Sequence, residues 1–132
     1  MERLDLFYKF GASAFGAATG YLFGGWSVLI QILLAFVVID YITGIIAAGY
    51  NGELKSKVGF LGISKKIMIF VMVAVTHLID TALGEGHIFR DAAIYFYLAN
   101  ELLSIVENAG KTGLPVPEQI KNAVEVLKGK SK

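Results

Sequence analysis

A stretch of thirty consecutive residues without a charged side chain, from Phe10 to Ile39, dominates this sequence. One transmembrane helix needs only about 20 apolar residues, so the stretch is too long for a single span. It is interrupted by Gly24-Gly25-Trp26-Ser27, a composition typical of a tight turn with an aromatic residue at the membrane interface. We therefore expect two helices joined as a hairpin. The whole chain is 55% hydrophobic and 17% charged, as expected for an integral membrane protein.

The hydrophobic segments predict an all-α fold with four transmembrane helices, at about residues 6–23, 27–48, 67–83 and 88–106. The fourth segment is interrupted by Asn100, Glu101 and Ser104, so three spans are the alternative. Residues 1–108 would then form the transmembrane domain, and residues 109–132 a cytoplasmic connector and tail. A short amphipathic helix is expected in this tail, because four apolar residues share one helical face, namely Ile120, Ala123, Val124 and Leu127.

Basic residues determine the expected orientation. The connection 51–66 carries lysines against the single acid Glu53, and more lysines follow the last predicted span. Since cytoplasmic loops of membrane proteins are enriched in Lys and Arg, we expect this loop and the C-terminal tail in the cytoplasm. Four spans place the N-terminus there as well. The lysines of the predicted cytoplasmic loop are Lys55, Lys57, Lys65 and Lys66.

The first predicted span has small residues at every fourth position, namely Ala12, Gly16, Gly20 and Gly24. Residues with this spacing lie on one side of a helix. Such a face lets another helix backbone approach closely, and helices in membranes associate by this kind of contact. Two interpretations are open. The face packs against another helix of the same chain, or it joins subunits of a homo-oligomer.

Polar and ionisable side chains occur inside the other three predicted spans. Burying a carboxylate at the membrane centre costs about 2.5–3.5 kcal/mol on insertion scales, so such groups should face protein or water and not lipid. They could therefore form hydrogen bonds between helices, or line a water-filled lumen when subunits assemble. These residues are Asp40 and Thr43 in the second span, His77 and Asp80 in the third, and Asn100 and Glu101 in the fourth.

These residues do not predict a catalytic, cofactor or metal site. The chain has no cysteine, and one His–Asp pair without further ligands is a weak indication of a metal. Neither a serine nucleophile elbow nor a phosphate-binding glycine loop is present in the sequence. The net charge of +1, without a basic surface, also argues against a nucleic-acid partner. We therefore expect a protein that is not an enzyme.

Several collinear motifs resemble the phage-lysis and toxin-secretion holin family. The resemblance covers roughly residues 30–128 and is weakest in the glycine-rich first span. The motifs that carry it are Asp40-Tyr41-Ile42-Thr43-Gly44, Gly52-Glu53-Leu54-Lys55-Ser56-Lys57, Gly62-Ile63-Ser64-Lys65-Lys66, the stretch from Asn100 to Asn108, and Gly113-Leu114-Pro115-Val116-Pro117 with the helix behind it.

The resemblance implies a small phage- or prophage-encoded protein of the bacterial cytoplasmic membrane. It implies self-association into lesions through which an endolysin, or in some systems a toxin, leaves the cell, and it implies no enzymatic activity and no cofactor. Two other functions are compatible with the residues. An antiholin, which binds a holin and delays it, would have a nearly identical sequence. A small polytopic transporter or channel could use the buried acids as a proton or cation relay.

Overall fold

The computed structural model describes residues 2–84 and 86–127, and these residues form five α-helices and no strand. The all-α prediction is therefore confirmed for the described chain. The helices are α1 (Glu2–Phe23), α2 (Val28–Tyr50), α3 (Ser56–Leu83), α4 (Ile88–Lys111) and the short α5 (Glu118–Leu127).

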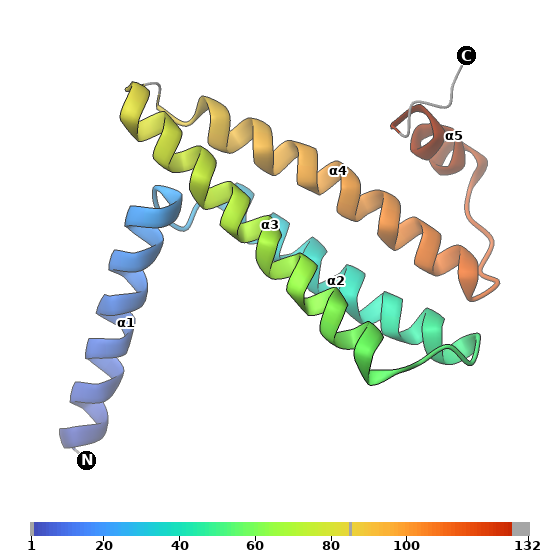
Figure 1. The fold of residues 1–132 in the computed structure, drawn as a ribbon, viewed down its shortest axis with the longest axis horizontal. Helices are drawn as coiled ribbons and strands as arrows, with labels where there is room; N and C mark the ends of the chain where they lie inside the picture. Colours follow the sequence, from blue (N-terminus) through green and yellow to red (C-terminus); the bar gives the residue numbers. More distant parts are fainter. Residues whose placement is uncertain (1, 85, 128–132) are drawn as a thin grey trace.

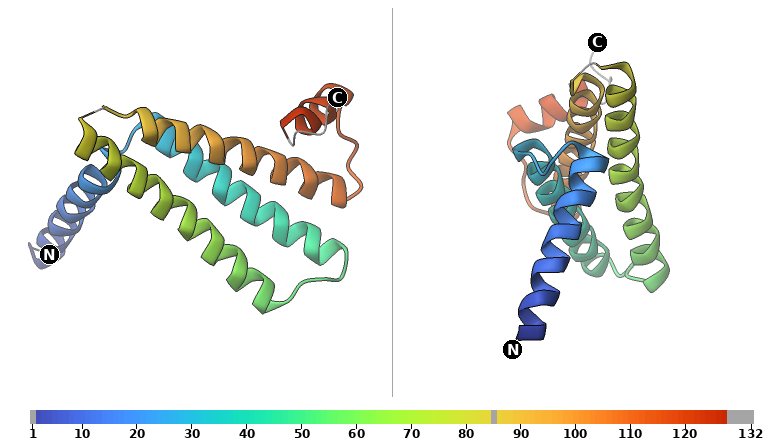
Figure 2. Two further views of the ribbon diagram at one scale, coloured as in Figure 1. Left: turned by 45° about the horizontal axis from the view of Figure 1, so that its top comes forward. Right: turned by 90° about the vertical axis from the view of Figure 1, so that its left-hand side faces the viewer.

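Helices α2, α3 and α4 lie side by side as a three-helix bundle, and α4 packs against both of the others (Figure 1). Helix α1 packs mainly against α3. It leaves the bundle near the α3–α4 turn and diverges from it, with the N-terminus at its far end (Figures 1 and 2). Helix α5 follows the connector 112–117 and lies to one side of the C-terminal half of α4 (Figures 1 and 2). The bundle therefore has two ends, one at the α2–α3 turn and one at the α3–α4 turn.

The bundle interior holds a small apolar core contributed by α2, α3 and α4. Phe23 and Phe70 meet edge to face beside it, with ring centroids 6.3 Å apart. Most of the large apolar side chains face outward instead, which in water would be an unusual apolar surface and in lipid is the expected one. The buried core residues are Ile30, Leu33, Val37, Val73 and Ile94.

Local signals explain where the helices begin and end. Ser27 caps α2, because its hydroxyl accepts a hydrogen bond from the Ile30 amide at 3.3 Å. Gly84 ends α3 in the left-handed conformation, with φ of 69°, which glycine adopts without strain. The connection between α2 and α3 comprises only residues 51–55.

The predicted basic loop 51–66 is therefore wrong in its secondary structure. Helix α3 already begins at Ser56, so Lys57, Lys65 and Lys66 belong to a helix. In the sequence, the first long apolar run of this region begins after Lys65-Lys66, and the third span is therefore expected to begin there. Backbone hydrogen bonding continues through charged residues, however, when their side chains reach solvent or a partner.

Two helices of the described chain are long and apolar enough to cross a membrane. They are α2 and residues 59–83 of α3, with mean hydropathies of 2.3 and 1.8. Only 22% of each apolar segment is buried inside the molecule, so neither resembles the core helix of a globular domain. By the same measure α1 and α4 do not qualify among the described residues. Composition thus supports two of the four predicted spans.

Candidate functional site

Polar side chains from three helices meet between α2, α3 and α4, towards the end of the bundle that carries the α2–α3 turn. The ammonium group at their centre comes from α3, and the carboxylates and amide around it come from α2 and α4. We call this group the lysine cluster. Its members are Asp40, Thr43, Lys66, Glu101 and Asn108.

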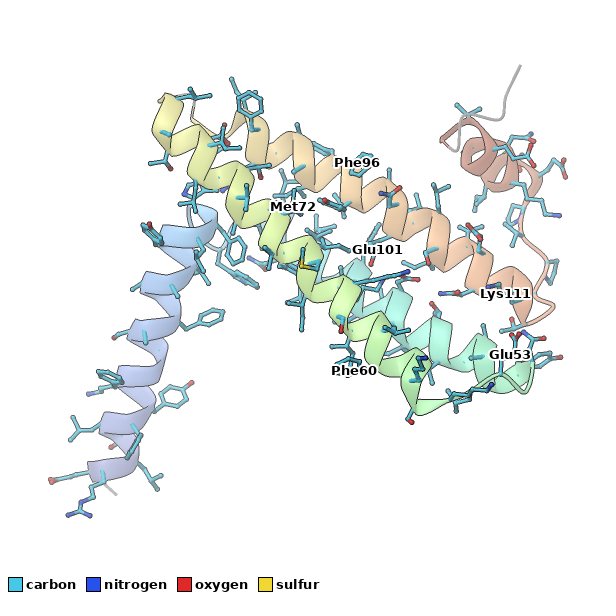
Figure 3. All side chains as sticks on the ribbon, in the orientation of Figure 1. Glu53, Phe60, Met72, Phe96, Glu101 and Lys111 are labelled. Atoms are coloured by element: carbon cyan, nitrogen blue, oxygen red, sulfur yellow. The ribbon has the colours of Figure 1, made fainter. Side chains whose placement is uncertain are left out.

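The Lys66 ammonium bridges the two carboxylates. It donates to both Glu101 oxygens, at 2.8 and 3.1 Å, and to Oδ2 of Asp40. Glu101 points from α4 into the space that it shares with α3 (Figure 3). The side chains of Asp40 and Glu101 are 4% and 5% exposed, whereas the side chain of Lys66 is 20% exposed. Both acids are thus buried away from lipid and water, and Lys66 is the cation that pairs with both.

Asn108 completes the cluster from α4. Its amide nitrogen donates to Oδ1 and to the backbone carbonyl of Asp40, at 2.9 and 3.1 Å. It also lies 2.9 Å from the hydroxyl of Thr43. Every carboxylate oxygen in the cluster therefore has a partner from a different helix, which is the arrangement that buried charges require in an apolar bundle.

A cavity of about 190 Å³ borders the lysine cluster. At the wall of this cavity, two glycines let α3 approach the Tyr41 side chain of α2 closely. An added Cβ at Gly59 or Gly62 would lie 3.3 Å from the Tyr41 side chain, and the Tyr41 hydroxyl donates to the Gly59 carbonyl at 3.3 Å. Polar and apolar groups share this wall, so the cavity is a place where water could reach the cluster.

A second polar group occupies the other end of the bundle, at the α3–α4 turn. Asp80 on α3 accepts hydrogen bonds from the backbone amides of Phe89 and Arg90, at 2.9 and 2.8 Å. These amides belong to the first turn of α4, which lacks intrahelical partners, so Asp80 caps a helix that follows its own. Arg90 in turn donates to the Phe23 carbonyl at the end of α1, at 2.7 Å. We call this group the turn cluster: Gly24, His77, Asp80, His87 and Arg90.

The structure separates the polar residues that the sequence singled out. Asp40, Thr43 and Glu101 meet in the lysine cluster, whereas His77 and Asp80 lie in the turn cluster. Asn100 is exposed in the single chain, so it forms no buried contact there, and its expected place in the lumen of an assembly stays a prediction. Asn100 precedes Glu101 by one residue, which is about 100° around a helix, so both cannot face the same interior.

Sequence reasoning missed four participants. It places Lys66 in a cytoplasmic loop, and it assigns Asn108, His87 and Arg90 to no site. Asn108 could have been found, because it follows Glu101 by seven residues and therefore lies on the same side of α4. Lys55, Lys57 and Lys65 are exposed, as residues facing a polar phase should be.

The small residues of α1 do not pack within the chain. Ala12 is exposed, and an added Cβ at Gly16 or Gly20 would meet no atom within 4 Å. Gly24 is different, because it lies in the turn after α1 with φ of +75° and touches His77 and His87. Of the two interpretations of this face, packing inside the same chain is therefore wrong for Ala12, Gly16 and Gly20. Assembly with another subunit stays a prediction.

Comparison with known proteins decides the family. The profile of the bacteriophage holin family matches residues 17–129. This chain belongs to the bacteriophage holin family. Holins are membrane-pore proteins and not enzymes, and this agrees with the expected absence of catalysis. Among the described residues, no three His, Cys, Asp or Glu side chains are grouped as metal ligands.

Relatives of this holin-family protein come from bacteria and from a phage. Protein Lmo0128 of Listeria monocytogenes is 51% identical over 128 residues, covering 97% of this chain and 91% of its own. Protein BH0965 of Halalkalibacterium halodurans is 50% identical over 131 residues, covering 96% and 97%. A probable holin of Bacillus phage phi105 is 36% identical over 110 residues, covering 83% and 81%. No solved structure matches the chain.

Proposed function

We propose that this protein is a holin that accumulates in the cytoplasmic membrane of its bacterial host and assembles into lesions. Through these lesions an endolysin, or in some systems a toxin, would leave the cytoplasm and the cell would lyse. The observation that carries the proposal is the family match over residues 17–129. The similarity to the probable holin of phage phi105 supports it further.

We propose four membrane spans, with both termini in the cytoplasm. Helices α1 and α4 have 22 and 24 residues, hence lengths of about 33 and 36 Å at 1.5 Å per residue, against about 30 Å of hydrocarbon. The charged residues inside α4 favour this proposal, because Arg90 and Glu101 are 5% and 4% exposed and do not face lipid. The exposed lysines around the α2–α3 turn then lie on the cytoplasmic side.

The lysine cluster suggests how the resting protein stays closed. In the single chain, Lys66 forms ion pairs with both buried acids, so their carboxylates do not need water as a hydrogen-bond partner. The open face of Ala12, Gly16 and Gly20 offers a second chain a place of close approach. As the protein accumulates, assembly through this face would compete with the internal contacts and turn Asp40, Asp80 and Glu101 towards a growing aqueous lumen.

Inducible expression in a bacterium tests the proposed function directly. The cells would also express an endolysin that lacks an export signal, and a dye would report the membrane potential. A holin should produce a sudden loss of potential followed by lysis, and cells with the endolysin alone should stay intact. Loss of potential without lysis would indicate a channel or transporter, since these do not pass a folded enzyme. Delay of a co-expressed holin, without lysis by this chain, would indicate an antiholin.

A further inference from the structure

The turn cluster contacts the C-terminal end of α1. The guanidinium of Arg90, itself 5% exposed, donates to the last carbonyl of α1 at Phe23. Immediately after it, Gly24 lies so close to the two histidines that an added Cβ would be 2.7 Å from His77 and 2.8 Å from His87. Most of α1 extends away from the bundle beyond this point (Figures 1 and 2). The turn cluster therefore contacts α1 at its C-terminal end, and the rest of the helix projects from that point.

In the turn cluster, His77 is placed where an added positive charge is poorly accommodated. The rings of His77 and His87 stack, with centroids 5.8 Å apart and planes 28° from parallel. His77 is only 8% exposed, and its Nδ1 has no hydrogen-bond partner. Two neutral imidazoles can stack in this way, but two imidazolium ions at this separation repel each other.

Among the described residues, the nearby carboxylates already have hydrogen-bond partners. From α3, Asp80 already accepts two backbone amides of α4. From α4, Arg90 adds a positive charge, and Asp91 is bonded to Arg90 through two nitrogens at 3.0 and 2.8 Å. The only charged residue of α2 is Asp40, which belongs to the lysine cluster. The charged residues of α1 are at its far end, at positions 2, 3, 5 and 9.

We propose that the turn cluster is an acid-sensitive latch that holds α1 against the bundle. When both imidazoles are neutral, the stacked rings pack against Gly24, and Arg90 binds the last carbonyl of α1. When both imidazoles take up protons, the rings separate, their contact with Gly24 is lost and α1 turns about Gly24-Gly25. Since proton uptake by imidazole separates the rings, acid is the stimulus. This inference rests on the proposed function only for the location of the latch, since the four-span orientation places the turn cluster at the outer face of the membrane.

Spin-label distances on the purified full chain in detergent test the latch. The sequence has no cysteine, so labels can be attached to Leu6→Cys on α1 and Phe96→Cys on α4, both exposed sites at 67% and 61%. Leu6 lies 18 residues before Gly24, or about 27 Å along the helix, so turning of α1 moves its label by on the order of 10 Å. Tyr95→Cys on α4 with Ile63→Cys on α3 is the matched control pair within the bundle.

We expect a single narrow distance between α1 and α4 at about pH 7.5, and a broad distribution displaced by on the order of 10 Å at about pH 5.5. The control pair should stay narrow at both values. His87→Gln, at an exposed position, should keep the narrow distance in acid, and Arg90→Ala should broaden it at both pH values. The proposal is overturned if the α1–α4 distance ignores pH, or if acid broadens it equally in the His87→Gln protein. Since no lysis is measured, failure of the latch is distinguishable from failure of the holin assignment.

Discussion

Replacing Lys66 by methionine tests whether the lysine cluster holds the bundle together. Methionine keeps most of the side-chain volume and removes the charge that satisfies Asp40 and Glu101, which are 4% and 5% exposed. Breaking a buried ion pair typically costs 3–5 kcal/mol, because the remaining charge stays buried without a partner. Since the Lys66 side chain is 20% exposed, we expect the lower end, about 3 kcal/mol, or roughly a hundredfold change in the ratio of folded to unfolded protein.

The assay is the free energy of unfolding in detergent micelles, measured by circular dichroism during denaturant titration. The matched control is Lys65→Met, because Lys65 is adjacent in sequence and exposed, and its replacement should change the free energy by less than about 0.5 kcal/mol. A third protein combines Lys66→Met with Asp40→Asn and Glu101→Gln. This protein has no unpaired charge in the cluster, so most of the lost stability should return. Equal stability of the Lys66→Met and Lys65→Met proteins would refute the reasoning.

Three other replacements test separate parts of the structure. Gly16→Leu with Gly20→Leu should leave the stability of the single chain unchanged, because an added Cβ meets no atom within 4 Å at either position, but should weaken crosslinked oligomers and delay lysis; unchanged crosslinking would show that this face is not the subunit contact. Asp80→Ala should lower the free energy of unfolding by about 1–3 kcal/mol, because two amides of α4 lose their acceptor, and Asp80→Asn should lose less; an unaffected Asp80→Ala protein would contradict the cap. Asn108→Leu should cost about 1–3 kcal/mol, since it removes the donor to Asp40, whereas Asn100→Leu at the exposed position on the same helix should be nearly neutral.

The sequence by itself determined the class of this protein and the number of its long helices. The charge-free stretch from Phe10 to Ile39 and the glycine pair inside it predict two helices with a turn between them, and α1 and α2 are joined at that point. The two helices could be predicted because the length and hydrophobicity of a segment are local properties of the chain. The expected hairpin packing is wrong, because α1 contacts α3 and diverges from the bundle (Figure 1). The family resemblance is equally a property of residue order, and the match over residues 17–129 confirms it.

Only the tertiary structure decided which polar residues meet. Asp40 pairs with Lys66 across 26 positions and with Asn108 across 68, and a separation in sequence does not indicate such a contact. The pairing depends on how each helix is rotated about its axis, and one position changes the facing direction by about 100°. This is why Glu101 faces the interior while Asn100 does not. Lys66 reaches the acids because α3 begins before the charged residues and carries them into the bundle.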